Sequence, residues 1–195
     1  MTDIGGIIGQ KYARLHPEKI KGMVFMETPL SDAETFHKTG GMMQHMLFRM
    51  AAKDKMGYKM FVKKNMFVKM MSMLIKRKLT KVEKETYTEP FTTIESRIPM
   101  FEVARTFPKK GKNATYGDMG DYLNKNAEWL MFSKHPKFLL KAKPGMLVNK
   151  SVVEWATSNL ENITIQEVGK AKHLMEEDLP HQIGSAIRNW YLSLE

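Results

Sequence analysis

The chain has 195 residues with 43% hydrophobic content, enough for one globular domain with a buried core, or for a domain that carries an inserted subdomain. It contains no cysteine, which excludes a disulfide framework, a thiolate zinc site and a cysteine nucleophile, and no apolar run is long enough for a transmembrane helix. The formal net charge of +10 suggests nucleic-acid binding, but no RNP, zinc-finger or helix-turn-helix pattern accompanies it, so we expect no nucleic-acid partner.

The absence of cysteine fits a reducing compartment, and no signal-peptide pattern precedes Thr2, so we expect a cytoplasmic protein.

The first predicted element is a helix from Gly6 to His16. Its spacing suggests that Ile7, Ile8, Tyr12 and Leu15 share one apolar face. The proline that follows predicts the end of this helix.

The segment "IKGMVFME", Ile20 to Glu27, is a short and nearly continuous apolar run that ends in an acid. Such a run is typical of a parallel strand buried on both faces. A helix followed closely by such a strand predicts a βαβ crossover, whose first strand would precede Thr2. We therefore expect the strand that supports the first turn to lie before the start of the chain.

From Pro29 to about Pro108 the strand-like runs give way to helical stretches rich in Met, Lys and Phe. Ten of the 18 methionines fall between Met42 and Met73. Because methionine adapts to irregular spaces, these side chains either fill a core or form a wall for an apolar ligand, and the two roles are compatible. We expect residues 29–112 to form an inserted helical subdomain between two core segments, 1–28 and 113–195.

The positive charge is concentrated in this subdomain. Residues Arg49 to Lys81 include 11 Lys and Arg against one acid, Asp54, whereas the other residues balance at 20 basic and 20 acidic. The pattern predicts a helical surface with a basic face. Such a face is either simply solvated or in weak contact with an acidic partner or an anionic membrane surface.

Strands and helices alternate again after Gly117. The predicted elements are a helix at Asp121–Phe132, a buried strand at Lys137–Ala142, a helix at Val152–Asn159, an exposed strand at Asn162–Val168 and a closing amphipathic helix at His181–Leu194. A turn, "AKHLMEEDLP", holds His173 after the last strand. This alternation predicts an α/β fold with a parallel sheet.

Three polar residues occupy equivalent places in the predicted sheet. Asp3 precedes the first helix on a glycine-assisted turn, Glu27 ends the first strand, and His173 follows the last strand. Because ligands bind beyond the carboxyl ends of parallel strands, we expect the three side chains to converge there. A carboxylate at a helix N-terminus can act as a nucleophile, a histidine can activate water, and a second carboxylate can fix the histidine tautomer.

Each of these residues alone has a simpler explanation. Asp3 could be a helix N-cap, Glu27 a strand-end charge paired with a lysine, and His173 an incidental loop residue. The chain order nucleophile, acid and histidine, with an insertion after the acid-bearing strand, is much more specific for a hydrolase.

Several separated motifs resemble the haloalkane dehalogenases, a family of α/β-hydrolases to which the coelenterazine luciferase of sea pansies is related. The motifs are "TDIGGIIGQKYARLHPEKIKGMVFMETP", "LIKRKLTKVEKETYTEPF", "PKFLLKAKPGML" and "AKHLMEEDLPHQIGSAIRNWYLSL", and they cover essentially the whole chain in the family order. The resemblance implies an α/β-hydrolase fold with a helical cap inserted after the sixth strand.

The resemblance also implies roles for individual residues. Asp3 matches the nucleophile, Glu27 the acid and His173 the base, while the backbone N–H of Ile4 would help bind an oxyanion or a departing halide. Some relatives carry the acid after the seventh strand, but that place reads "KAKPGML" here and has no carboxylate. The implied reaction uses a small apolar substrate and water, with no cofactor and no metal.

The chain departs from the family in three respects. The family usually has Trp after the nucleophile, where this chain has Ile4, and its "HFxQED" motif reads "HLMEED" from His173. The first strands of the family would all precede Met1, so we expect about the C-terminal two-thirds of a hydrolase, with an unpaired sheet edge.

The alternatives to a haloalkane dehalogenase-like enzyme are an epoxide hydrolase-like enzyme that uses Tyr58 and Tyr87, a luciferase-like enzyme, or a catalytically inactive fragment.

Overall fold

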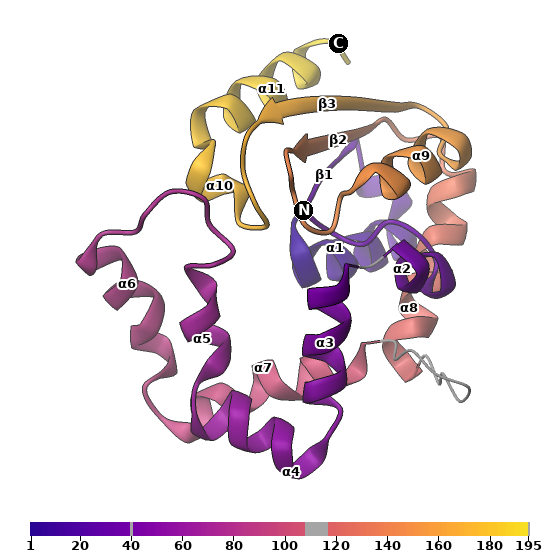
Figure 1. Ribbon diagram of the computed structural model, residues 1–195. Coiled ribbons are helices and arrows are strands. Elements are labelled where there is room, and N and C mark those ends of the chain that lie inside the picture. Colours follow the sequence, from indigo (N-terminus) through magenta and orange to yellow (C-terminus); the bar gives the residue numbers. More distant parts are fainter. Residues whose placement is uncertain (40, 108–116, 195) are drawn as a thin grey trace.

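The computed structural model of the chain describes residues 1–39, 41–107 and 117–194 (Figure 1). Within these ranges no helix combines the length and the apolarity that crossing a membrane requires. In chain order the elements are α1 (Asp3–Leu15), η1 (Pro17–Lys19), β1 (Met23–Met26), α2 (Ala33–Thr39), α3 (Met42–Ala51), α4 (Asp54–Gly57), η2 (Tyr58–Lys63), α5 (Met66–Met71), α6 (Lys81–Thr88), η3 (Glu89–Phe91), α7 (Ile94–Thr106), α8 (Gly117–Phe132), β2 (Lys137–Ala142), α9 (Lys150–Asn159), β3 (Ile163–Gly169), α10 (Met175–Asp178) and α11 (Pro180–Leu192).

A parallel sheet in the order β1, β2, β3 lies at the centre of the core. Met23 of β1 is paired with Lys137 of β2, and Lys137 is paired in turn with Ile163 of β3. On the other side of β1, Thr2 forms an isolated parallel bridge with Met26. The predicted parallel sheet is confirmed, and the first residues of the chain lie where the βαβ pattern requires a neighbour for β1.

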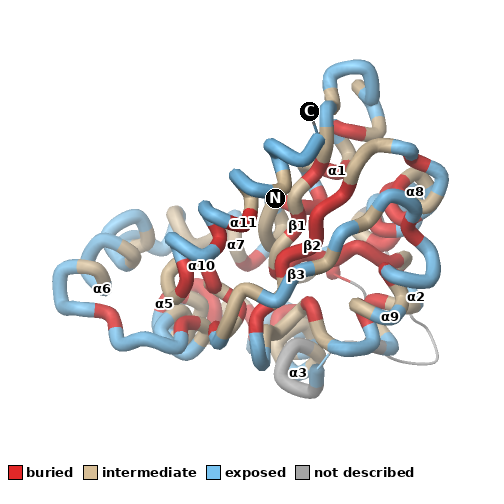
Figure 2. Tube along the Cα trace, turned by 90° about the horizontal axis from the view of Figure 1, so that it is seen from above, coloured by how far each residue is buried: buried red, intermediate tan, exposed pale blue. Residues whose placement is uncertain are grey.

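Helices lie on both faces of the sheet, and β1 and β2 form its buried middle, whereas β3 is half-buried to exposed (Figures 1 and 2). On one face, Phe25 and Leu139 belong to a core cluster to which α1, α8 and α9 contribute. On the other face, Phe138 and Leu140 pack with residues of α10 and α11. Burial on alternating sides explains the continuous apolar runs of β1 and β2, while β3 has only half-buried and exposed residues, as expected of the predicted exposed strand.

Helix α1 turns a different face toward the core than its hydrophobic residues suggest. Ile8, Tyr12 and Leu15 are 65%, 49% and 55% exposed, so the predicted apolar face is wrong for these three residues. Ile7 is buried as predicted, together with Gly6, Gln10 and Ala13. The close contact of the helix with the chain after β1 decides this orientation, and there the Gln10 side chain donates to the carbonyl of Pro29 at 2.8 Å.

One lysine, Lys137, is fully buried at the start of β2. Its Nζ donates to the carbonyl oxygens of Ser133, His135 and Glu161 at 2.6, 3.1 and 2.9 Å. Burial lowers the pKa of Lys137, because it disfavours the charged ammonium, while the carboxylate of Glu161 opposes this change. The lysine therefore joins the end of α8 to the starts of β2 and β3.

The segment between β1 and α8 forms helices that project beyond one end of the sheet (Figure 1). It has a core of its own, built around Phe61 and Phe101. A second cluster joins it to α1 and α8, and there the ring of Phe48 stacks on Phe107 with centroids 4.5 Å apart. The expected boundary between residues 112 and 113 lies outside the described residues, and the division into cap and core stays a prediction.

Candidate active site

Asp3 stands where the first residues of the chain turn into α1. Its backbone φ is +44°, in the left-handed region that residues other than glycine rarely adopt. The turn is held by the Asp3 N–H, which donates to the Glu27 carbonyl at 3.0 Å, and by the Thr28 hydroxyl, which donates to the Asp3 carbonyl at 2.7 Å. The Asp3 side chain is 48% exposed, so the turn presents its carboxylate to incoming molecules at the N-terminus of α1.

The two glycines after Ile4 have different roles. A Cβ at Gly6 would lie 2.0 Å from the Thr28 hydroxyl oxygen, the same group that supports the Asp3 carbonyl. A Cβ at Gly5 would meet nothing within 4 Å. Gly6 therefore permits the close approach of α1 to the end of β1, and Gly5 is not needed for it.

Glu27 follows β1 and is completely buried. Its Oε2 accepts hydrogen bonds from the backbone N–H groups of Met146 and Leu147 at 2.9 and 2.8 Å, and its Oε1 accepts one from Val148 at 3.4 Å. A Cβ at Gly145 would approach Oε1 to 2.9 Å, and Gly145 has a φ of +65°. The loop after β2 thus supplies donors to the carboxylate, a role that sequence reasoning missed because backbone N–H groups have no residue signature.

His173 lies between the two carboxylates. Its Nε2 is 3.3 Å from Oδ2 of Asp3, and its Nδ1 is 3.3 Å from Oε2 of Glu27. Burial alone would disfavour the charged imidazole, but the hydrogen bonds with the two carboxylates outweigh it and raise the pKa of His173 to about 9. The structure therefore brings together all three side chains that the sequence singled out.

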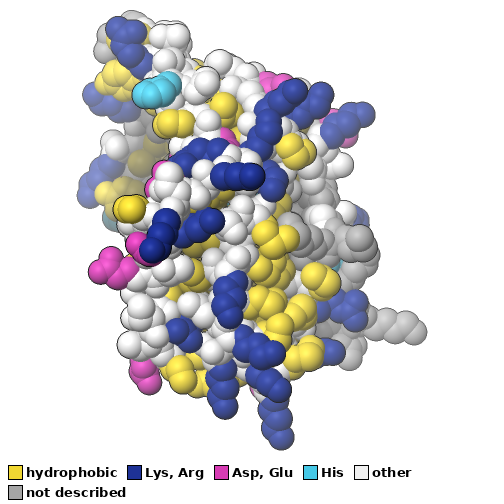
Figure 3. All heavy atoms as spheres, turned by 60° about the vertical axis from the view of Figure 1, so that its left-hand side comes forward, with side chains coloured by type: hydrophobic (Ala, Val, Ile, Leu, Met, Phe, Trp, Pro, Cys, Tyr) yellow, Lys and Arg dark blue, Asp and Glu magenta, His cyan; other side chains and the backbone are white. Residues whose placement is uncertain are grey.

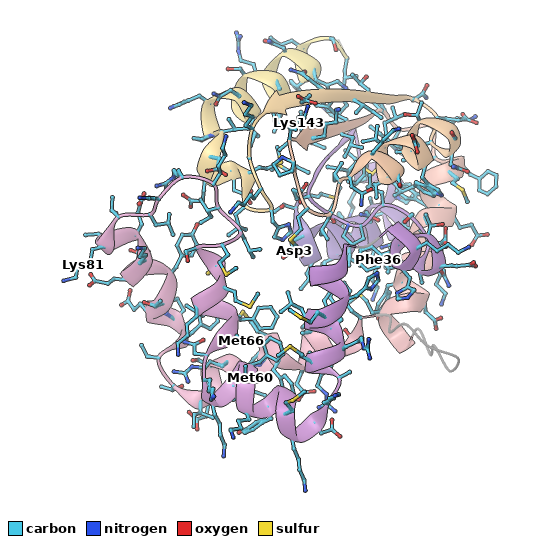
Figure 4. The ribbon with its side chains drawn as sticks, in the orientation of Figure 1. Asp3, Phe36, Met60, Met66, Lys81 and Lys143 are labelled. Carbon is cyan, nitrogen blue, oxygen red and sulfur yellow. The ribbon has the colours of Figure 1, made fainter. Side chains whose placement is uncertain are left out.

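Ile4 belongs to the first turn of α1, and its side chain packs against the cluster that joins α1 and α8 to the helices between β1 and α8. The N–H of Gly6 donates to the Thr2 carbonyl at 2.8 Å, whereas the Ile4 N–H has no acceptor within the described part of the chain. In Figure 4, Asp3 lies at the start of α1, and Met60 and Met66 lie below it among the helices between β1 and α8. Among the described residues, no group of three or more His, Asp or Glu side chains has an arrangement that could hold a metal ion.

Comparison with known proteins finds haloalkane dehalogenases among the curated relatives. A haloalkane dehalogenase of Mesorhizobium japonicum is 27% identical over 191 residues, which cover 96% of this chain and 60% of the relative. A haloalkane dehalogenase of Sphingobium indicum is 30% identical over 192 residues, which cover 95% of this chain and 60% of the relative. The chain therefore spans about 60% of the length of these relatives. No family model matches the chain.

Solved structures agree with these relatives. The haloalkane dehalogenase DatA of Agrobacterium tumefaciens superposes with a TM-score of 0.87 over 100% of this chain and 65% of that structure, and its 22% identity makes this a likeness of fold. An ancestral haloalkane dehalogenase is 30% identical, with a TM-score of 0.86 over 99% of this chain and 67% of that structure. The chain belongs to the haloalkane dehalogenase family. Its three parallel strands and flanking helices are thus part of an α/β-hydrolase fold, as the motifs predicted.

We expect Gly6→Ala to lower the free energy of unfolding by about 2 kcal/mol, because the added methyl group would overlap the Thr28 hydroxyl. Gly5→Ala is the matched control in the same helical turn. It should leave stability unchanged or raise it by up to about 1 kcal/mol, since alanine favours the helix and meets no neighbour. Urea unfolding of both variants measures the difference, and equal effects would contradict the close approach at Gly6.

We expect the free energy of unfolding to fall as the pH rises from 6.5 to about 9. The folded-state pKa of His173 lies above its ordinary value of 6.5, so the bound proton stabilises the folded chain below pH 6.5, and this contribution is lost as the pH rises through 9. The shift corresponds to about 3 kcal/mol. Urea unfolding across this pH range should show the decline in the parent chain and a smaller decline in His173→Gln, whereas parallel profiles would argue against the raised pKa.

Proposed function

We propose that the chain carries the catalytic residues of a haloalkane dehalogenase, with Asp3 as nucleophile, Glu27 as the acid and His173 as the base. The observation that carries this proposal is the place of His173, 3.3 Å from an exposed carboxylate on one side and from a fully buried one on the other. Membership of the haloalkane dehalogenase family supports a small halogenated alkane as substrate, with water as the second reactant.

In the first step an Asp3 carboxylate oxygen attacks the carbon that bears the halogen, and the carbon–halogen bond breaks. The halide leaves with the bonding electron pair, and an ester links Asp3 to the substrate. The N–H of Ile4 has no acceptor among the described residues and is available to the halide or to the later oxyanion. Because the Ile4 side chain donates nothing, the site has one donor fewer than relatives that have Trp at this place.

The second step needs a neutral imidazole. Esterification removes the negative charge of Asp3 from beside Nε2, so one of the two carboxylates that raise the pKa of His173 is lost and that pKa falls. His173 can then take a proton from water while the hydroxide adds to the ester carbonyl, after which the alcohol leaves and the Asp3 carboxylate is restored. Glu27 holds the Nδ1 proton and stabilises the imidazolium.

We propose that residues 29–112 form the cap over this site and that residues 1–28 and 113–195 form the core. The cap has its own aromatic cluster, which supports an independent packing unit. Met60 and Met66 are partly buried on the side of the cap that faces Asp3 in Figure 4. Flexible thioether side chains at this place favour an apolar substrate pocket.

The epoxide hydrolase alternative receives less support from the two cap tyrosines. The hydroxyl of Tyr87 donates to the Glu177 carboxylate. The ring of Tyr58 packs edge-on against Phe101 in the core of the cap, with ring centroids 6.0 Å apart. Both tyrosines therefore have structural contacts, and the curated relatives support the dehalogenase rather than the epoxide hydrolase or the luciferase.

Incubation with 1-bromobutane tests the first step. We expect His173→Phe to accumulate a butyl ester on Asp3, because alkylation proceeds while hydrolysis lacks its base. Mass spectrometry of the peptide from Met1 to Lys11 detects the ester, and the double variant Asp3→Asn, His173→Phe is the matched control. A peptide that stays unmodified in folded His173→Phe, or that is modified equally in the control, would contradict the proposal.

We also propose that the chain is cytoplasmic and that the basic surface of its cap contacts anionic lipid. All 11 Lys and Arg between Arg49 and Lys81 are exposed, and Figure 3 shows such side chains along the cap with hydrophobic groups between them. The single acid of this segment, Asp54, is paired with Arg105 at 2.5 Å. Met73 is 57% exposed, whereas the aromatic residues of the segment are buried or half-buried, which favours a lipid surface over base stacking.

Sedimentation with vesicles tests this contact. We expect binding to vesicles that contain phosphatidylserine and not to vesicles of phosphatidylcholine alone. Reversal of Lys53, Lys55 and Lys59 to Glu should reduce binding at least a hundredfold, since each lysine near an anionic surface contributes about 1 kcal/mol. Reversal of three exposed core lysines changes the net charge equally and should bind more tightly than the cap variant; these control residues are Lys134, Lys150 and Lys170. Equal losses would show a nonspecific charge effect.

A further inference from the structure

The loop that carries His173 is hydrogen-bonded to the cap on both sides of the histidine. Before it, Nζ of Lys172 donates to the carbonyl of Met73 at 2.9 Å. After it, the N–H of Leu174 donates to the carbonyl of Leu74 at 3.1 Å. The two acceptors are adjacent residues of the loop that follows α5, so His173 stands between two contacts with one segment of the cap.

The same cap loop continues along the acidic residues that follow His173. The Asp178 carboxylate accepts the N–H of Lys76 at 2.9 Å and the N–H of Arg77 at 2.7 Å. Nε of Arg77 donates to the carbonyl of Glu177 at 2.8 Å. The segment 172–178 has only the short helix α10 of its own, so these contacts with the cap supply much of its order.

The guanidinium of Arg77 bridges this segment to α6. Nη1 and Nη2 donate to the Glu83 carboxylate at 3.0 and 2.8 Å, and Nη2 also contacts the Glu177 carboxylate. Glu83 in turn closes a capping box with Thr80 at the start of α6, and the Tyr87 hydroxyl donates to Glu177. The hydrogen bonds from Arg77 hold the pKa of Glu83 down to about 2.

A lysine could not replace this arginine, because the fork of a guanidinium donates to two carboxylates and a carbonyl at fixed angles. A single exposed ion pair contributes little to global stability, so the main effect of the bridge is expected in local geometry. Directly before this loop the chain is also hydrogen-bonded to the loop after β2, because the Gly145 N–H donates to the Ala171 carbonyl at 3.1 Å. The position of the imidazole therefore depends on contacts from both units.

We infer that Arg77 is a positioning residue for His173. Arg77 joins α6 to Glu177 and thereby fixes the loop from Lys172 to Asp178. The imidazole therefore stays between Asp3 and Glu27 as long as the cap contacts this loop. The role of His173 as a base rests on the proposed function. The position of its imidazole ring can be tested without any turnover of substrate.

The test is an NMR titration of the His173 ring in Arg77→Met, with the signal assigned by its loss in His173→Gln. Arg77 carries a positive charge and neutralises the Glu177 carboxylate. The loss of this charge would by itself raise the pKa of His173. Loosening of the loop would instead lower it, because the imidazole would move away from its two carboxylates. We expect a fall from about 9 toward 6.5 by at least about one unit.

Arg105→Met is the matched control. Arg105 also lies in the cap, pairs with two acids, Asp54 and Glu102, and has a side-chain exposure of 35% against 36% for Arg77. It should leave the pKa of His173 unchanged. A pKa that is unchanged or raised in folded Arg77→Met, or an equal fall in Arg105→Met, would overturn the inference.

Should Arg77→Met not fold, Tyr87→Phe serves as the second variant, because it removes one hydrogen bond to Glu177 without changing any charge. We expect a smaller fall in the pKa of His173, and no fall would overturn the inference. Alkylation of Asp3 is measured separately. A missing ester with the expected titration would contradict the proposed function alone, and an ester without the titration change would contradict the positioning role alone.

Discussion

The arrangement of the site depends on one carboxylate that has no access to water. A buried charge that lost its partners would cost several kcal/mol, so Glu27 requires the three backbone N–H groups and the imidazole that surround it. The end of β1, the loop after β2 and the loop after β3 must therefore meet at one point. The Glu27 carbonyl also accepts the N–H of Asp3, so the same residue places the start of α1.

Much of the fold could be predicted because its strands are short apolar runs with clear ends. The predicted strand at Lys137–Ala142 agrees with β2 at both ends, and the predicted elements after Gly117 agree with the structure to within four residues. The buried face of α1 could not be predicted in the same way. Its orientation follows from the approach of Gly6 to Thr28. A pattern of hydrophobic residues cannot report this contact, because glycine has no side chain.

The convergence of the three residues proposed as catalytic could be predicted because each is a reactive side chain after a predicted strand or at the start of a predicted helix. Their partners could not be found from the sequence. The donors to Glu27 are main-chain groups of Met146, Leu147 and Val148, and any residue except proline could supply them. The contacts of Arg77 with Glu177 join residues 100 positions apart, which no local pattern reports.

The surroundings of the two carboxylates distinguish the roles proposed for them more sharply than their order in the chain does. Both contact the same imidazole at 3.3 Å, but the Asp3 side chain is 48% exposed and Glu27 is enclosed by backbone donors. A nucleophile has to exchange its hydrogen bond for a new covalent bond, which an exposed oxygen can do at small cost. A group that orients the histidine has to keep its contacts throughout the reaction, and a carboxylate held by three N–H groups meets that requirement.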